Sequence, residues 1–450
     1  MKLDLNARFK SIQFALKFAK NPIPGMLANF ERKGPTFNTY LGGIQPSLMT
    51  KDPEIIRHVL QKNHRNYIKT PMIFEKLRQF LGNGLLTSEG AYWLQQRRLI
   101  QPGFHRQRLT ALVEIMDQVI KEADDKLQAS IQKGAPVDVY QMMMHLAFGI
   151  VSRSLFSTEV AADKLDFLSY SLTTIQAFLV RQIRQPFLNP WFKLSGQLKK
   201  HIDLSKAADE IILDLIRRRR EATGDYDDLL QMLLEARYED TGEGMTDQQL
   251  LEEVNIIMTA GHETSANALS WIFYLLAQHP EIVHRLQKEL AMVLGDRPLS
   301  FADLPQLVYT SQVIEEGMRL YPPAWVTDRM AIADDEVNGV SIPKDYMAVL
   351  VIYALHHDPK YWPEPESFNP DRFDPEKKKQ QVPYTYLPFG GGPRLCIGNN
   401  FAMMEMQMVL AYFLRKYGLS LVLGQQVEML PLVTLRPKNG IQIYFQKKHI

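Results

Sequence analysis

Cysteine is almost absent from this chain: Cys396 is the only one in 450 residues. A single thiol excludes an internal disulfide, and it excludes a zinc or iron–sulfur site that needs several cysteines. It also indicates a reducing compartment. We therefore expect a cytoplasmic protein.

Long apolar runs and a strong net charge are missing as well. No run reaches the roughly 18–20 residues that a bilayer-spanning helix needs, so we predict no transmembrane anchor. The formal net charge is only +2, which argues against binding nucleic acid through bulk charge. Near the N-terminus, apolar residues recur at helical spacing between basic ones. This stretch favours packing against the body of the protein over weak contact with a membrane surface; its apolar residues are Leu5, Phe9, Ile12 and Leu16.

Most of the chain from about residue 81 to 321 reads as successive helices with short polar or Gly/Pro breaks. The longest is expected over residues 247–278, and roughly 30 residues would make a rod of about 45 Å. Another predicted helix ends in four arginines, Arg217 to Arg220, which we expect to face solvent near the helix C-terminus.

β-Strand patterns appear at both ends of the sequence. "EVNGVSIPKDYMAVLVIYAL" contains β-branched or alternating apolar runs around the turn signal Asn338-Gly339, and "VEMLPLVTLRPKNGIQIYF" repeats that pattern. The early segment "FNTYLGGIQPSLMT" is expected to join the same small sheet. The sequence therefore predicts a mainly α protein with a small β lobe made from N-terminal and C-terminal strands, in a single domain over residues 1–450.

The single cysteine lies in a glycine-rich, basic stretch, "FGGGPRLCIG", residues Phe389 to Gly398. A hydrolytic nucleophile would also need a histidine base and an oxyanion hole, and a structural cysteine usually lies in an apolar stretch. A haem group needs only one axial thiolate from the protein. Glycines let backbone N–H groups turn toward the sulfur, Arg394 can reach a haem propionate, and Phe389 can cover the sulfur. These features favour a haem ligand.

The same stretch resembles the Phe-x-x-Gly-x-Arg-x-Cys-x-Gly signature of the cytochrome P450 family, the haem-thiolate monooxygenases. The resemblance implies haem b as cofactor and Cys396 as the axial ligand of its iron. It also implies the family fold, in which a long central helix lies over the haem and the cysteine loop lies beneath it.

A second motif, "AGHETSA", falls in the middle of the predicted long helix. In one interpretation Thr264 only donates a hydrogen bond back to the carbonyl of Ala260. The family motif implies instead that Gly261 leaves room for dioxygen against the haem, which Ala260 also contacts. It further implies that Thr264 donates a hydrogen bond to the dioxygen and that Glu263 helps to relay protons. Beside the cysteine loop, this second interpretation is favoured. His262 is expected to be packed or solvated.

Further arginines match family positions. Trp93 and Arg97 are one helical turn apart in "WLQQR", and the resemblance implies that they and Arg329 contact the haem propionates. Glu316 and Arg319 share a helix face. With Arg372, in "PESFNPDRF", they are implied to form a structural cluster that holds the cysteine loop.

The substrate is expected to be lipophilic, because the residues predicted to wall its pocket are apolar. They are Leu86, Ala260, Trp325, Val326 and Val433. The stretches "LYPPAW" and "VTLRPKNGI" resemble bacterial family members that act on fatty acids or on carotenoid or terpenoid-like compounds.

The reaction implied is hydroxylation with O2 and two electrons from a separate ferredoxin or flavodoxin with its reductase. Such a donor is expected to dock near Lys377 to Lys379 and Arg394. Three alternatives stay open: a peroxygenase that uses hydrogen peroxide, a haem-binding sensor without enzymatic activity, and a cysteine hydrolase. The Glu263–Thr264 pair favours dioxygen activation, because a peroxide user needs no proton relay.

Overall fold

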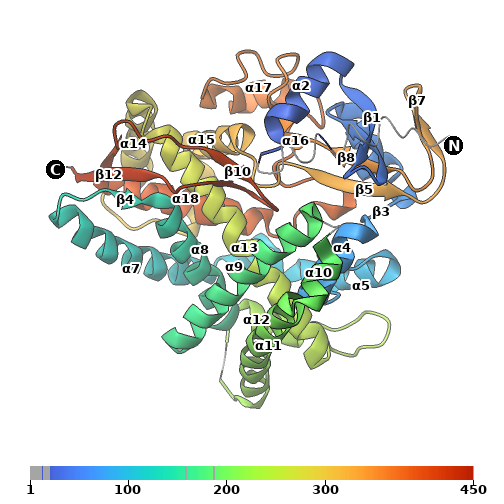
Figure 1. Cartoon of the computed structure of the whole chain (residues 1–450). Coiled ribbons are helices and arrows are strands. Elements are labelled where there is room, and N and C mark those ends of the chain that lie inside the picture. Colours follow the sequence, from blue (N-terminus) through green and yellow to red (C-terminus); the bar gives the residue numbers. More distant parts are fainter. Residues whose placement is uncertain (1–12, 14–20, 158–159, 186–187, 225, 449–450) are drawn as a thin grey trace. The chain divides into compact units, whose positions relative to one another are not determined.

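The computed structural model describes residues 13, 21–157, 160–185, 188–224 and 226–448. The chain divides into two compact units (Figure 1). Unit 1 comprises Met1–Ile73, Glu315–Cys396 and Glu428–Lys438, and unit 2 comprises Phe74–Ile314, Ile397–Val427 and Asn439–Ile450. The predicted amphipathic N-terminal stretch, Leu5 to Leu16, lies outside the described residues except for Gln13.

Unit 1 is built on a five-stranded mixed sheet in the order β1-β2-β8-β5-β3 (Figure 1). The early segment joins this sheet as predicted. It forms an antiparallel hairpin whose second strand pairs in parallel with β8. The strands of the sheet are β1 (Thr36–Leu41), β2 (Gln45–Thr50), β3 (Tyr67–Ile68), β5 (Thr327–Ala331) and β8 (Met347–Leu350). Three short helices accompany the sheet in sequence, namely α2 (Ile23–Lys33), α3 (Pro53–Arg57) and α16 (Ile352–His356), and α17 (Pro375–Gln380) follows them.

Two hairpins complete unit 1. β6 (Asp335–Val337) and β7 (Val340–Ile342) join through Asn338 and Gly339, which both have positive φ, as the turn signal predicts. β10 (Met429–Pro431) pairs with β11 (Leu435–Pro437). One strand prediction is wrong in part: in "AVLVIYAL" only the first half is extended, and the chain turns into α16 at Ile352. Every residue of α16 is buried, so its apolar run fits a buried helix as well as a strand.

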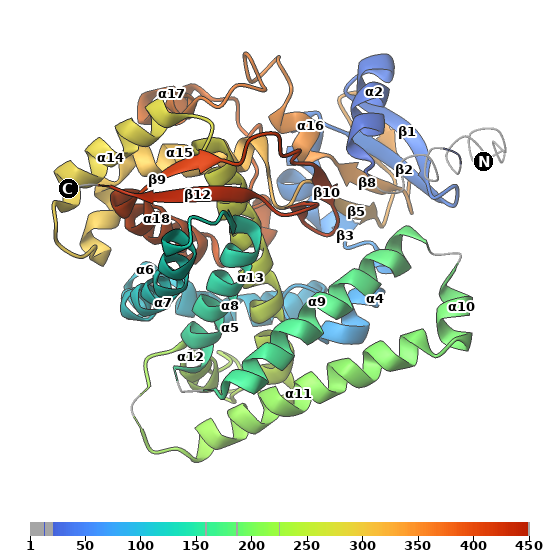
Figure 2. The same cartoon turned by 60° about the vertical axis from the view of Figure 1, so that its left-hand side comes forward.

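Unit 2 contains the helical body that the sequence predicts (Figure 2). α8 is apolar almost all round because it packs against both α7 and α13. α9 and α11 lie side by side. The helices are α4 (Pro71–Leu81), which starts in unit 1, α5 (Gly90–Ile100), α6 (Arg106–Leu109), α7 (Leu112–Gln132), α8 (Val139–Phe156), α9 (Ala162–Arg184), α10 (Asn189–Leu194), α11 (Gln197–Glu221), α12 (Leu229–Glu235), α13 (Asp247–Leu276), α14 (Pro280–Leu294), α15 (Val308–Leu320), which ends in unit 1, and α18 (Asn399–Lys416).

α13 is the predicted long helix, and its 30 residues confirm the expected length. A capping box fixes its start: the Gln249 backbone N–H donates to Thr246 Oγ1 at 3.3 Å, and the Thr246 N–H donates to Gln249 Oε1 at 2.9 Å. It ends at Leu276, shortly before Pro280 opens α14. Most of its residues from Leu250 onward are buried, so this helix forms the centre of unit 2.

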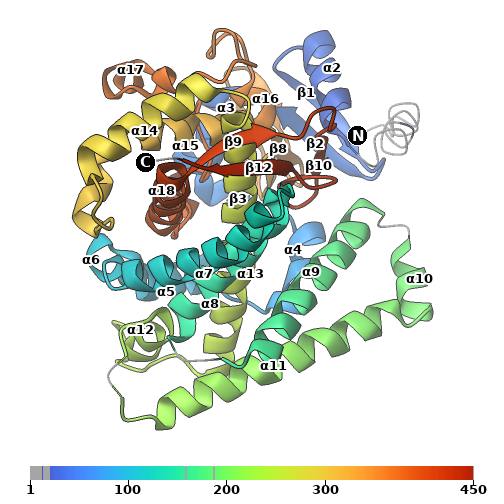
Figure 3. The ribbon, with the colours of Figure 1, turned by 90° about the vertical axis from the view of Figure 1, so that its left-hand side faces the viewer.

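The C-terminal strand does not join the sheet of unit 1, contrary to the expectation of one β lobe. β12 (Gln442–Lys447) pairs instead with β9 (Tyr417–Leu421), beside which it runs in Figure 3, and with β4 (Val137–Asp138), labelled in Figure 1; all three belong to unit 2. Asp138 explains part of this pairing, because its carboxylate accepts hydrogen bonds from the N–H groups of Tyr140 and Ile441. One side chain thereby caps α8 and holds the start of the C-terminal strand.

The four arginines at the end of α11 are not all solvated. Arg219 is 6 % exposed, and its guanidinium donates to both oxygens of Asp228 at 2.7 and 2.8 Å. It also donates to the Phe156 carbonyl. The prediction was wrong for this residue, because sequence position alone does not reveal which arginine meets a buried carboxylate. Among the residues that the structure describes, no helix is long and apolar enough to cross a membrane.

Candidate active site

The cysteine loop belongs to unit 1 as far as Cys396 and is closed by its own backbone. A turn from Leu387 to Gly390 is followed by a short 3₁₀ segment, Gly392–Arg394. The Cys396 N–H donates to the Phe389 carbonyl at 3.0 Å, which brings the two ends of the loop together. Gly390 and Gly392 have φ of +75° and +66°, values that favour glycine.

Gly392 is also the point where the loop meets its support. A Cβ atom at this position would lie 1.9 Å from the carbonyl oxygen of Leu60. That oxygen is backbone, so it cannot move aside as a flexible side chain can. A Cβ at Gly390 would meet nothing within 4 Å. The two glycines therefore share a backbone conformation, but only Gly392 is required for close packing.

The residues of this loop and its surroundings fit a haem group. Cys396 is exposed, whereas a cysteine without a chemical role is usually buried. Arg394 and Arg329 are half-buried; Arg329 Nη1 donates to the Asp328 carbonyl at 2.6 Å. Lys69, which the sequence reasoning missed, is 7 % exposed. Burial raises the pKa of the Asp328 carboxyl, and the positive charge of Lys69 lowers it. Unit 1 thus carries one exposed thiol and several cations, the donor set that an iron with two carboxylate side groups needs.

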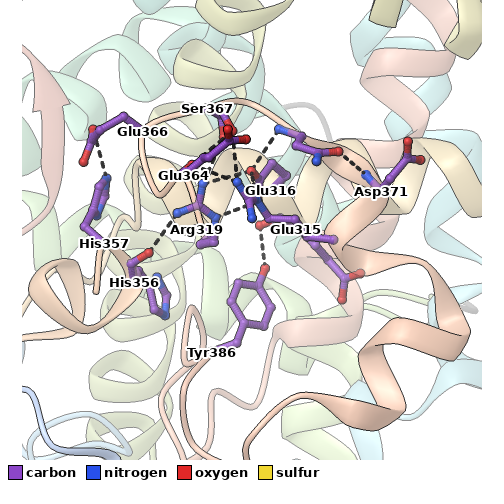
Figure 4. Close-up of polar contacts among 12 residues, drawn as sticks. Glu315, Glu316, Arg319, His356, His357, Glu364, Glu366, Ser367, Asp371 and Tyr386 are labelled. Atoms are coloured by element: carbon purple, nitrogen blue, oxygen red, sulfur yellow. Dashed lines mark hydrogen bonds and ion pairs between the residues drawn. The ribbon is translucent and has the colours of Figure 1, made fainter. Parts of the chain in front are cut away.

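The Glu–Arg–Arg cluster forms as predicted, entirely within unit 1 (Figure 4). Arg319 is completely buried and makes a two-bond contact with Glu316, at 2.7 and 2.9 Å. Arg372 Nε donates to the same carboxylate at 3.2 Å, and so does the backbone N–H of Asn369 at 3.0 Å. The remaining Arg319 donors reach the carbonyls of His356 and Ser367. This cluster has a structural role, because it ties α15 to the segments before the cysteine loop.

In unit 2, the middle of α13 has one uncovered strip. Ala260 is exposed and Thr264 half-buried, although Met258, His262 and Ser265 around them are buried. The Thr264 hydroxyl donates back to the Ala260 carbonyl at 2.7 Å. The hydrogen bond expected in the simpler interpretation therefore exists, and Thr264 must turn its hydroxyl before it can donate elsewhere.

Gly261 and His262 of the same motif are closely packed, and Glu263 is buried. A Cβ at Gly261 would lie 2.9 Å from Val151 Cγ2 of α8, so this glycine permits close packing of the two helices. The predicted room for dioxygen stays a prediction. His262 is packed, with its Nδ1 2.8 Å from the Met258 carbonyl and its ring edge-on to Phe148. Glu263 is 4 % exposed, so its carboxyl does not lie at the surface.

Trp93 and Arg97 lie one turn apart on α5, as the sequence predicts. Trp93 is 9 % exposed, and Arg97 is half-buried with its Nε donating to Gln101 Oε1 at 3.2 Å. Their predicted contact with a propionate stays a prediction.

The predicted substrate contacts differ in how much surface they offer. Leu86 in unit 2 and Val433 in unit 1 are 36 % and 45 % exposed, and Val326 is half-buried. Trp325 is 4 % exposed within the apolar core of unit 1, and its Nε1 donates to the Leu432 carbonyl at 3.1 Å. Its structural role is therefore packing, and it has the least surface to give to a substrate.

A buried carboxyl that the sequence reasoning missed holds the segment that carries Leu86. Glu253 of α13 is 1 % exposed, and its Oε2 accepts the Leu85 backbone N–H at 3.0 Å. The close approach needs Gly84, where a Cβ would lie 3.0 Å from Glu253 Cδ. Burial raises the pKa of Glu253 to about 7, the Leu85 N–H lowers it, and the Glu252 charge raises it.

Two further features of the surface bear on partners. Of the three lysines of α17, Lys378 and Lys379 pair with Glu315 and Glu376, so the predicted basic docking surface is partly neutralised. A cavity of about 870 Å³ in unit 2 lies between α5, α12 and residues 235–240. None of the predicted site residues lines it.

The family model described as "Cytochrome P450" matches residues 9–445. The chain is 33% identical over 435 residues to cyclooctatin synthase of Streptomyces melanosporofaciens, covering 94% of this chain and 90% of that protein. It is 35% identical over 375 residues to cyclooctat-9-en-7-ol 5-monooxygenase of the same organism, covering 83% and 80%. It is 32% identical over 434 residues to cytochrome P450 4A7 of Oryctolagus cuniculus, covering 91% and 83%.

The crystal structure of the cytochrome P450DA heme domain resembles the whole fold, with a TM-score of 0.86. It covers 96% of this chain and 95% of that chain at 23% sequence identity. The predicted mainly α architecture with small sheets is confirmed by this likeness.

Gly392→Ala is expected to weaken the cysteine loop more than Gly390→Ala does. Both changes place alanine at positive φ, which costs about 1 kcal/mol. Only the first forces the Leu60 backbone to move, which adds about 1–3 kcal/mol. The measurement is the urea concentration at which each purified protein loses bound haem. Equal sensitivity of the two variants would contradict the packing role of Gly392.

Glu253→Gln is expected to flatten the pH dependence of stability between pH 5 and 8. The folded protein holds the Glu253 proton up to about pH 7, whereas the unfolded chain releases it near 4.5. Stability from this group is therefore lost as the pH rises through that window, by about 3 kcal/mol. Urea unfolding at pH 5 and 8 measures the change. The control, Glu252→Gln, alters the neighbouring carboxyl and should retain most of the parent slope; an unchanged slope in Glu253→Gln would contradict the assignment.

Proposed function

Because the chain belongs to the cytochrome P450 family and is a haem-dependent monooxygenase, we propose that Cys396 holds the haem iron and that the substrate has a cyclic terpenoid-like skeleton. The observation that carries the first part is the exposed single thiol in a closed glycine loop. The second part rests on relatives and is argued below.

Haem, when bound through a thiolate, activates dioxygen with two external electrons and inserts one oxygen atom into the substrate, while the other becomes water. The protein binds and orients this group. Cys396 would supply the sulfur ligand of its iron, and Arg329 and Arg394 would supply hydrogen-bond donors for its carboxylates. Trp93 and Arg97 are proposed for the same role. Lys69 adds a further buried cation to unit 1. Phe389 is half-buried next to the loop closure and is suited to keeping water from the sulfur.

Thr264 is the residue we assign to proton delivery. Its hydroxyl donates to the Ala260 carbonyl, and the hydroxyl oxygen can still accept a hydrogen bond. Rotation of the side chain would free the hydroxyl proton to be donated to a molecule bound beside the uncovered strip of α13. Glu263, directly before it in sequence, is proposed as the next proton donor. Since Glu263 is buried, further groups or water must connect it to solvent.

The substrate class is inferred from the relatives and from the chemistry of the predicted walls. One relative carries the name cyclooctat-9-en-7-ol 5-monooxygenase, so it acts on a cyclic alkenol, and a second is named cyclooctatin synthase. Leu86, Val326 and Val433 offer apolar surface that suits such a skeleton. A fatty acid is the second candidate, because its apolar chain would suit the same predicted walls.

The electron donor is proposed to be a separate ferredoxin or flavodoxin with its reductase. The family model accounts for residues 9–445 of this chain. Arg394 and the exposed Lys377 remain the candidates for a docking contact. A cytoplasmic location stays a prediction from the single cysteine.

Replacement of the axial ligand tests the function directly. Cys396→Ser is expected to remove the long-wavelength Soret band of the reduced carbon monoxide complex, because a neutral hydroxyl donates far less charge to iron than a thiolate. Absorption spectra of parent and variant measure this. A variant that keeps the band would show that sulfur is not the ligand, and a colourless parent that is inactivated by alkylation would favour the hydrolase alternative.

Thr264→Ala is expected to keep that band and to lower product formed per reducing equivalent by about tenfold or more, because the hydroxyl that donates the proton is removed. Hydrogen peroxide should rise correspondingly. Thr264→Ser keeps a hydroxyl and is the matched control. Product, peroxide and consumed NAD(P)H are measured together with the reconstituted donor, and unchanged coupling in Thr264→Ala would refute the assignment.

A further inference from the structure

His356, the last residue of α16, contacts Arg319 of the Glu–Arg–Arg cluster (Figure 4) and also Leu387, just before the cysteine loop. Its side chain is completely buried. Its backbone carbonyl accepts a hydrogen bond from Arg319 Nη1 at 2.8 Å. Its ring nitrogen Nε2 accepts the backbone N–H of Leu387 at 2.9 Å. One residue therefore contacts the buried guanidinium with its backbone and the start of the loop with its side chain.

The ring must be neutral to accept this hydrogen bond, and its surroundings keep it so. Burial lowers the pKa of His356 well below its usual value, and the nearby His357 and Arg319 lower it further. The carbonyl groups of Arg319 and Met318 act in the opposite direction. With Nε2 as the acceptor, the single ring proton resides on Nδ1.

The residue before Leu387 is anchored in a parallel way. The Tyr386 ring stacks on His356 with centroids 5.3 Å apart, and its hydroxyl donates to the Glu315 carbonyl at 2.8 Å. From Leu387 the backbone enters the turn that ends at Gly390. The Phe389 carbonyl within that turn accepts the Cys396 N–H. A chain of short contacts thus leads from α15 through the His356 ring to the backbone of Cys396.

We propose that His356 is a positioning residue for Cys396, which uses its Nε2 lone pair to fix the Leu387 amide and so the point where the cysteine loop begins. This inference rests on the proposed function, since it assumes that Cys396 is the iron ligand. Nothing in the loop itself replaces the bond: Leu387 is 5 % exposed, so water cannot readily satisfy its N–H. Without the acceptor, the turn that carries Phe389 loses its support and the sulfur loses its fixed place.

The neighbouring histidine provides a matched control. His357 is also buried, stacks on Tyr353 and has its Nδ1 2.8 Å from the Tyr353 carbonyl. Its side chain makes no hydrogen bond to the described part of the loop. His356→Phe and His357→Phe therefore remove the same kind of ring at adjacent positions, but only the first removes the acceptor of the Leu387 amide.

The experiment follows the long-wavelength Soret band of the reduced carbon monoxide complex over time in a low concentration of guanidinium chloride. Far-ultraviolet circular dichroism in the same solution reports unfolding. His356→Phe is expected to lose the band about tenfold faster than the parent protein, and ahead of the dichroism change. His357→Phe should remain within about twofold of the parent, because the His357 side chain makes no hydrogen bond to the cysteine loop as the structure describes it. Equal rates of band loss in these two variants, or band loss that only follows unfolding, would overturn the proposal.

Replacing His356 with glutamine or asparagine tests whether the acceptor must reach the Leu387 amide or whether any polar side chain is enough. The His356→Gln side chain can place an oxygen where Nε2 lies, whereas His356→Asn is too short and reaches only the place of Nδ1. His356→Gln should retain the band at a rate near that of the parent, and His356→Asn should behave like His356→Phe. This pair also decides the question if His356→Phe does not fold, and equal behaviour of the pair would overturn the proposal. A parent protein that lacks the band altogether would instead refute the proposed function.

Discussion

A fully buried guanidinium that must find a partner for each of its N–H groups is the constraint on which unit 1 depends. Arg319 has no exposed surface, and an unpaired buried charge would cost several kcal/mol. Its donors end on the carboxylate of Glu316 and on two backbone carbonyls, those of His356 and Ser367. Backbone carbonyls cannot be moved without moving the chain. The ion pair therefore determines where α16 ends and where the segment before Arg372 passes, and both lead toward the cysteine loop.

The loop itself obeys a second constraint, which is lack of space. At Gly392 the backbone passes so close to the Leu60 carbonyl that no side chain fits, and the positive φ excludes most other residues in addition. Cys396, which follows in the same loop, is exposed, yet its backbone N–H donates to the Phe389 carbonyl. A rigid backbone that presents an accessible sulfur is what a metal ligand requires, because the ligand must be both fixed and reachable.

The sequence predicted those parts of the molecule that depend on local pattern. The helical body, the length of α13, the hairpin at Asn338-Gly339 and the Glu316–Arg319 pair all follow from periodicity, turn residues or helix spacing. It failed where the outcome depends on partners far away in the chain. Arg219 is buried because it pairs with the buried carboxylate of Asp228. β12 lies outside the sheet of unit 1 because it pairs with β9 and β4.

The candidate site shows the same division. The cysteine loop and the motif around Thr264 are contiguous stretches with recognisable chemistry, so they could be found in the sequence. Lys69, Glu253 and His356 could not, because each acquires its role from burial and from a single contact across tens or hundreds of residues. At Gly261 the structure adds a packing reason that the motif does not reveal, because its missing side chain allows the close approach of α8.

Glu253 and His356 use one physical device in two places. Each is an ionisable side chain that burial favours in the neutral form, and each accepts a backbone N–H from a loop, at Leu85 and at Leu387. Their titrations have opposite signs. Glu253 gains a buried charge as the pH rises through about 7, whereas His356 would lose its acceptor only on strong acidification, since its pKa lies well below the usual value. At neutral pH, His356, which supports the cysteine loop, is therefore far from its pKa. Glu253, which supports the segment of Leu86, is close to its own pKa. Of the two loops, the one predicted to touch substrate is the one whose support changes near physiological pH.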